Sequence, residues 1–146
     1  MTDRATLLAL AERVEAATGA DRELGARVIA ASLAPANAFV EQSKINGAWC
    51  IYTADADGKN RSWQPPRGVR GYDRCPTESL DAAMSLVPSG WDWSLNGEGN
   101  PKSYVAELWV YFGDGEAIAK AATPALALTA ACLRARAIAW SMTDAN

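Results

Sequence analysis

The chain contains no histidine, and this absence narrows its chemistry more than any other feature of its composition. Histidine is the commonest general base near neutral pH, and it belongs to most nucleophilic catalytic pairs and to many zinc sites. A Ser-His or Cys-His catalytic pair and a histidine-liganded zinc are therefore excluded. Catalysis by carboxylates or by a lysine stays open.

Cysteine is scarce as well. Cys50, Cys75 and Cys132 lie far apart in the sequence and are odd in number. This pattern is typical of reduced thiols in a cytoplasm, and it leaves no spacing typical of a metal site. We therefore expect no disulfide framework, no metal and no other cofactor.

Long apolar runs are also absent. Charged residues interrupt the apolar positions near the N-terminus, so this segment predicts an amphipathic helix and not a secretory leader. No apolar stretch approaches the length of a membrane span. Because the net charge is −3, we expect neither membrane binding nor general binding of double-stranded nucleic acid. The expected location is the cytoplasm.

What is present fits one globular domain covering residues 1–146, with 49% hydrophobic and 21% charged residues. Residues 1–34 predict a helical hairpin, with Asp3 and Asp21 as the N-caps of its helices. In residues 47–64, Ala48, Cys50 and Tyr52 alternate with Trp49, Ile51 and Thr53, and an Asp57-Gly58 turn follows, which predicts a β-hairpin.

Residues 77–142 predict an α-β-β-α core. Thr77 is expected to cap its first helix, and Thr123 followed by Pro124 is expected to start its last one. Two apolar strands lie between these helices. The order α-α-β-β-α-β-β-α predicts the α+β class, with helices packed on an antiparallel sheet.

The last helix is apolar on two nearly opposite sides. One side carries Leu126, Ala130, Leu133, Ala137 and Trp140, and the other carries Leu128, Ala131, Cys132, Ala135 and Ile138. A helix of this kind is normally covered on both sides, by a sheet and neighbouring helices or by another subunit. We therefore predict a homo-oligomer formed through this helix.

Trp91 and Trp93 lie two positions apart in a strand candidate, so both side chains point to the same side. This alternation predicts two core residues packed on an alanine-rich helix. A stacking platform for a ligand is the alternative.

Residues 59–76 form a basic segment, with five basic residues and one acid, so that its charge is +4 and the remainder of the chain carries −7. Prolines and glycines predict an exposed loop over residues 64–76. Arginine side chains bind phosphates and carboxylates, and aromatic rings stack on bases. A nucleotide, a short single strand or an acidic patch on a protein would fit, whereas a solvated loop is the alternative. The predicted ligand-binding or partner-binding residues are Arg61, Trp63, Arg67, Arg70, Tyr72 and Arg74.

Two carboxylate pairs offer an enzymatic alternative. Asp92 with Glu98, or Glu107 with Asp114, would lie near each other across the second hairpin, as glycosidase acids do. Exposed carboxylates without a shared role are the ordinary explanation of such residues.

Three blocks of the sequence resemble the phage ABA-sandwich domain family, whose members are small proteins of bacteriophages and prophages. The blocks are SLDAAMSLVPSGWDWSL at 79–95, ATPALALTAACLRARA at 122–137 and LLALAERVEAATGADRELGARVIA at 7–30. The resemblance implies a layered α-β-α sandwich, a viral or prophage origin and therefore the host cytoplasm. It carries over no catalytic residue and does not cover the basic segment.

These observations predict a non-enzymatic phage accessory protein. It would bind a host defence protein or a nucleotide signal through the arginine-rich loop, as an inhibitor or a sponge. A virion structural or assembly protein and a small carboxylate-using, nucleotide-processing enzyme are the alternatives.

Overall fold

The computed structural model describes residues 3–65, 75–111 and 113–144. Its helices and strands are α1 (Arg4–Ala16), α2 (Arg22–Leu33), β1 (Phe39–Gln42), β2 (Trp49–Ala54), β3 (Asn60–Ser62), α3 (Leu80–Met84), β4 (Trp91–Glu98), β5 (Ser103–Val110), β6 (Glu116–Ala121) and α4 (Pro124–Asp144). The expected order is confirmed in outline, and two strands, β1 and β6, are added to it.

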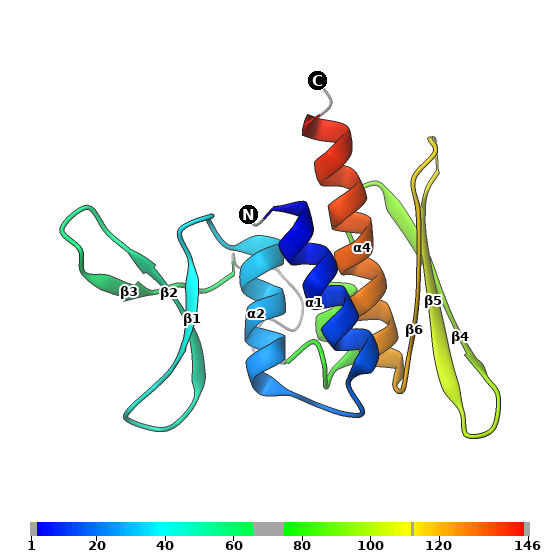
Figure 1. Ribbon diagram of the computed structural model, residues 1–146, viewed down its shortest axis with the longest axis horizontal. Helices are drawn as coiled ribbons and strands as arrows, with labels where there is room; N and C mark the ends of the chain where they lie inside the picture. Colours follow the sequence, from blue (N-terminus) through cyan, green and yellow to red (C-terminus); the bar gives the residue numbers. More distant parts are fainter. Residues whose placement is uncertain (1–2, 66–74, 112, 145–146) are drawn as a thin grey trace.

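The helices lie in the middle of the molecule, with a three-stranded antiparallel sheet on either side (Figure 1). The N-terminal sheet, β1-β2-β3, packs on α2, and the C-terminal sheet, β4-β5-β6, packs on α4. The α+β class and the packing of helices on antiparallel sheets are confirmed. The order of the layers differs from a single sheet between helices, because β1 turns the first hairpin into a second sheet.

The register of the C-terminal sheet determines which side chains face the core. Trp93 lies opposite Leu108, which in turn lies opposite Ala117 on β6. The inward residues of β5 and β6 are buried, and Trp91 and Trp93 pack against the core as half-buried side chains. The prediction that both indoles are core residues is confirmed.

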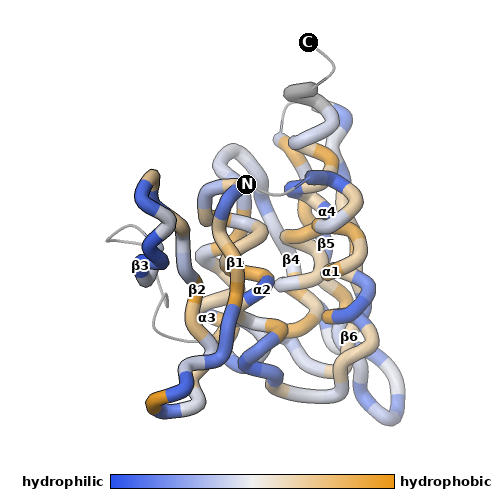
Figure 2. The backbone as a smooth tube through the Cα atoms, turned by 60° about the vertical axis from the view of Figure 1, so that its left-hand side comes forward, coloured by the Kyte–Doolittle hydropathy of each residue, from blue (hydrophilic) through white to orange (hydrophobic). Residues whose placement is uncertain are grey.

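Helix α4 is covered on both apolar sides by its own chain. The C-terminal sheet packs on one side, and α1, α3 and, to a smaller extent, α2 pack on the other, while residues 138–141 near its C-terminal end are only half-buried. Figure 2 shows mostly hydrophobic residues along α4 and hydrophilic residues along β3. The two-sided pattern therefore requires no second subunit. Among the described residues, no helix combines the length and apolarity needed to cross a bilayer.

Polar side chains fasten α4 to the neighbouring segments. The buried Thr129 hydroxyl donates to the Pro76 carbonyl oxygen at 2.9 Å. Arg136 donates to the carbonyl oxygens of Leu86 at 3.0 Å and Ser32 at 3.1 Å. These bonds link α4 to the C-terminal end of α2 and to both flanks of α3.

The helix starts follow the capping rules, with one correction. Asp3, Asp21 and Thr123 accept hydrogen bonds from backbone N–H groups in the first turns of α1, α2 and α4. Thr77, however, does not cap α3. Ser79 does so, because the Thr77 hydroxyl is buried against the backbone of Asp21.

Candidate ligand-binding cleft

A cleft of about 540 Å³ lies between α2 and the N-terminal sheet. Its volume falls within the range typical of small-molecule sites. The lining comprises Arg22, Gly25, Ala26 and Ile29 of α2, residues Gly47–Ile51, residues Ser62–Pro65, and Cys75.

Two tryptophans lie on the sheet side of this cleft. Alternation along β2 places Trp49 on the same face as the buried Ile51, the face that packs on α2. The Trp63 N–H donates to the Ile51 carbonyl oxygen at 2.7 Å, which continues the antiparallel pairing one residue beyond β3. Trp63 therefore lies diagonally from Trp49 on the same face of the sheet. Residues in this relation are roughly 7–8 Å apart in the backbone, so one aromatic ligand can contact both indole rings.

The opposite side depends on a glycine in α2. A Cβ atom at position 25 would collide with the sulfur of Cys75, so only glycine lets this segment pack so closely. The Thr77 hydroxyl accepts from the Asp21 N–H and donates to the Asp21 carbonyl oxygen, both at 2.9 Å. Its Oγ1 also lies 2.9 Å from the Cys75 sulfur. The end of the cleft at Cys75 is therefore fastened to the first turn of α2.

The cleft is mainly apolar and aromatic, with one cationic group at its rim. Arg22 is the only charged residue in the described lining. Its guanidinium lies 3.4 Å from the Glu78 carboxylate, and both side chains are well exposed. An exposed ion pair of this kind contributes little to the stability of the fold. Arg22 can therefore leave Glu78 and bind an anionic ligand with only a small loss of free energy.

The three thiols lie in different surroundings. Cys75 is half-buried and lines the cleft. Cys50 is half-buried too, but alternation along β2 turns its side chain to the face opposite Trp49, and Cys132 is a buried residue of α4. Burial raises the pKa of the Cys132 thiol to about 12, so this thiol stays protonated at physiological pH. Among the residues that the structure describes, no group of three histidine, cysteine or acidic side chains could bind a metal ion.

The predicted site residues fall into three groups. Trp63 lines the cleft, as a ligand-contacting residue should. Arg61 does not line it, because its guanidinium donates to Asp55 at 3.0 Å from an exposed position. Arg67, Arg70, Tyr72 and Arg74 lie outside the described residues.

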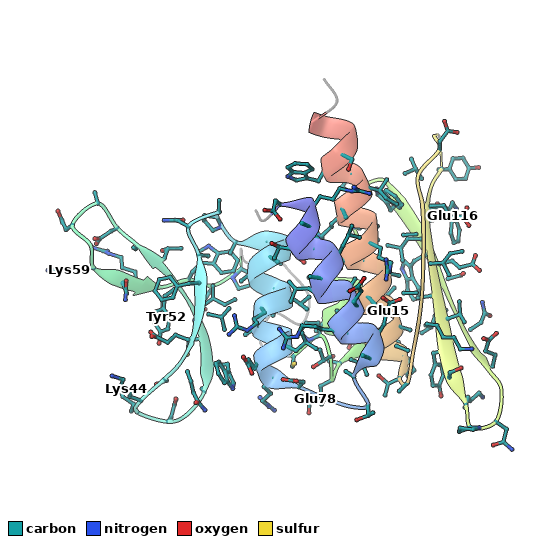
Figure 3. All side chains as sticks on the ribbon, in the orientation of Figure 1. Glu15, Lys44, Tyr52, Lys59, Glu78 and Glu116 are labelled. Carbon is teal, nitrogen blue, oxygen red and sulfur yellow. The ribbon has the colours of Figure 1, made fainter. Side chains whose placement is uncertain are left out.

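The start of the basic segment belongs to the hairpin predicted over residues 47–64. Asn60–Ser62 forms β3, and Lys59 lies at the outer tip of the β2–β3 hairpin (Figure 3). Asp55 organises this tip by accepting from the Lys59 N–H at 2.9 Å and from the Asp57 N–H at 3.0 Å. These backbone bonds and the Arg61 guanidinium lower the pKa of the Asp55 carboxyl. Lys59 and Arg61 thus belong to the outer hairpin and not to the cleft.

Sequence reasoning missed Trp49 and Arg22 as cleft residues. The alternation of β2 already grouped Trp49 with Ile51 on one face, which was a usable signal. Which helix covers that face is a long-range property, and it decides that Arg22 lies beside the indoles.

The proposed carboxylate pairs do not form. Asp92 and Glu98 lie at opposite ends of β4, roughly 20 Å apart at the usual rise per residue, and Glu98 pairs with Lys120 at 3.0 Å. Glu107 lies within β5, whereas Asp114 belongs to the turn that follows it.

No protein-family model matches this chain, and the comparisons with curated proteins and with solved structures find no match either.

Proposed function

We propose that the protein binds a nucleotide-type ligand in the cleft between α2 and the N-terminal sheet, without transforming it. The observation that carries this proposal is the pair of indoles, Trp49 and Trp63, on one wall with Arg22 at the rim. Indole rings stack on any base, and a guanidinium binds phosphate oxygens in a bidentate manner. A base against the tryptophans and a phosphate at the rim satisfy both groups.

The basic segment adds to the anion-binding capacity. Residues 66–74 connect Pro65 to Cys75, and both of these residues line the cleft. The three arginines between them, Arg67, Arg70 and Arg74, are therefore proposed as further phosphate contacts, with Tyr72 as a further stacking group.

The composition of the cleft supports binding and not catalysis. Its described lining contains no carboxylate and no lysine, and the whole chain contains no histidine. The described residues of the lining therefore include no carboxylate, histidine or lysine that could act as a general base. In the setting implied by the sequence resemblance, the protein would act in the host cytoplasm as a phage-encoded sponge for a nucleotide signal of host defence.

Protection of the Cys75 thiol provides the first test. Mono-, di- and cyclic dinucleotides are titrated against the protein by calorimetry, and alkylation of each cysteine is followed by mass spectrometry. A ligand that occupies the cleft should slow the alkylation of Cys75, which lines the cleft, more than that of Cys50, whose side chain lies on the opposite face of β2. Equal alkylation of Cys75 with and without every nucleotide in the panel would contradict the proposal.

Substitutions on the two faces of β2 provide the second test. Trp49→Leu or Trp63→Leu should weaken binding about tenfold, because each removes a stacking surface. Tyr52→Leu is the matched control, since Tyr52 lies on the opposite face of β2 against Phe39. Arg67→Ala with Arg70→Ala should weaken binding further and reduce its salt dependence. Equal affinities for the tryptophan variants and the control would exclude this cleft, and ligand turnover would favour the enzymatic alternative.

A further inference from the structure

The outer face of the C-terminal sheet is turned away from α4, and no element of the described chain covers it (Figure 1). Large hydrophobic side chains are nevertheless exposed there. Trp109 is 36% exposed and Ile118 is 51% exposed, while Tyr111, just beyond the end of β5, is 71% exposed. Large apolar side chains exposed together on one face of a sheet are a common feature of interaction sites.

Carboxylates lie beside these exposed side chains, and the pairing of the strands gives their positions. Trp109 on β5 lies directly opposite Asp92 on β4 and Glu116 on β6. Glu107 lies two residues before Trp109 on the same face and opposite Ile118. Because opposite residues on one face have Cβ atoms about 4.5–5.5 Å apart, the indole lies between two carboxylates. Figure 3 shows Glu116 on the side of the sheet that faces away from the helices.

The face is negatively charged around the indole. Its lysine, Lys120, forms an ion pair with Glu98 at 3.0 Å toward the other end of the sheet. Within the described parts of the chain, Asp92, Glu107 and Glu116 have no ion-pair partner. Three carboxylates thus lie around one exposed indole, and no cation of the described residues neutralises them.

We propose that this face binds a basic polypeptide segment of another protein. An arginine of that segment would stack on Trp109 and donate hydrogen bonds to Asp92 and Glu116, and an apolar side chain beside it would cover Ile118. A guanidinium combines a planar cationic face with donors at its edge, so it matches an indole flanked by two carboxylates. Nucleic acids and anionic membranes are excluded as occupants, because the face would repel them.

This interface is separate from the candidate cleft. The helices lie between the two sheets (Figure 1), and the cleft lies between α2 and the N-terminal sheet, on the far side from the C-terminal sheet. The protein could therefore bind a small ligand on one side and a basic partner on the other, and the test of one site does not depend on the other.

The probe is a short synthetic peptide of alternating arginine and leucine, with an alternating glutamate and leucine peptide as its counterpart. Binding is followed by ¹⁵N-correlated NMR, including the indole N–H of Trp109. We expect the arginine peptide to shift signals of β4, β5 and β6, with an affinity that falls as salt increases, and the glutamate peptide to shift none.

Variants locate the interaction. Trp109→Ala and Glu116→Gln should each weaken binding of the arginine peptide about fivefold to tenfold. Glu12→Gln on α1 and Ile45→Ala in the β1–β2 turn are matched controls, since Glu12 is an exposed acid and Ile45 is a fully exposed hydrophobic residue. Glu116 is exposed, so its variant tests the site even if the Trp109 variant proves unstable.

Three results would overturn the proposal. The first is equal binding of the arginine peptide by the Glu116 variant and the two controls. The second is equal binding of the glutamate peptide. The third is concentration-dependent self-association in sedimentation velocity that Trp109→Ala abolishes while the arginine peptide fails to bind, which would assign the face to a second copy of this chain.

Discussion

At the scale of single residues, position decides the chemistry of the three cysteines. The Cys132 thiol is fully buried on α4 and donates to the Ala83 carbonyl oxygen at 3.8 Å. Burial raises its pKa from 9.0 to about 12. Cys50 and Cys75 are only half-buried. One residue type is therefore chemically inert at one position and accessible at the other two.

We expect two of the three thiols to react with a thiol reagent in the folded protein, and Cys132 to react only after unfolding. The raised pKa of Cys132 also makes stability depend on pH. Below pH 9 this thiol is protonated in both states, so it contributes no pH dependence. Between pH 9 and about 12 the unfolded chain loses a proton that the folded chain keeps, so the free energy of unfolding decreases as pH rises.

Urea denaturation on either side of pH 9 measures this effect. Cys132→Ala should reduce the dependence of the unfolding free energy on pH, whatever its effect on the absolute value. Leu133→Ala serves as the control, since it removes buried apolar volume from the same helix without removing a titratable group. A rapid reaction of Cys132 in the native protein would show that it is not buried.

At the scale of helices and strands, local signals predict some elements and not others. The N-caps at Asp3, Asp21 and Thr123 were readable because capping depends on a side chain and its nearest backbone. The aromatic alternation of β4 and β5 was equally readable. Strand β6 was not, because its sequence EAIAKA contains only one residue with a strong preference for strands. It forms because β5 pairs with it and because its small inward alanines fit beneath α4.

The candidate site shows the same division between local and long-range information. Trp63 was predicted from its place among basic residues, a local pattern. The pairing of Trp63 with Trp49 depends on the strand register, and the position of Arg22 depends on how α2 packs on the sheet. Neither relation is encoded within a short window of sequence. Thr77 illustrates the opposite error, since a good local capping residue is used instead for a long-range bond to Asp21.

The two faces of the C-terminal sheet should differ in their sensitivity to truncation. Leu108 is completely buried against the core, so Leu108→Ala should lower the free energy of unfolding by about 2–5 kcal/mol. Ile118, on the adjacent strand and the outer face, should lose less than about 1 kcal/mol in Ile118→Ala. Chemical denaturation of both variants measures the difference. Equal losses would mean that something covers the outer face.

At the scale of the whole molecule, the two sheets are attached to the helices unequally. The C-terminal sheet packs along α4 and also contacts α1, whereas the N-terminal sheet contacts only α2 among the described helices. The buried residues are concentrated in α1, α2, α4 and the inward side of β5 and β6. The N-terminal sheet therefore depends on one helix for its position.

We expect amide hydrogens in β1, β2 and β3 to exchange with solvent faster than those in β5, β6 and α4. Segments with few buried apolar contacts open at a lower free-energy cost than the core does. Hydrogen–deuterium exchange with mass spectrometry measures the order directly. A ligand in the cleft should slow exchange in β2 selectively, because it would bridge the sheet and α2. Uniform protection of both sheets would contradict the unequal attachment.

Gly25 links the helical layer to the size of the cleft. The sulfur of Cys75 occupies the volume that a methyl group on this residue would need. Replacing Gly25 with alanine would add one carbon atom at this point, and the segment that carries Cys75 would have to move away from α2. The cleft would then change in width although both indoles stay the same, so this single position in α2 controls the size of ligand that fits.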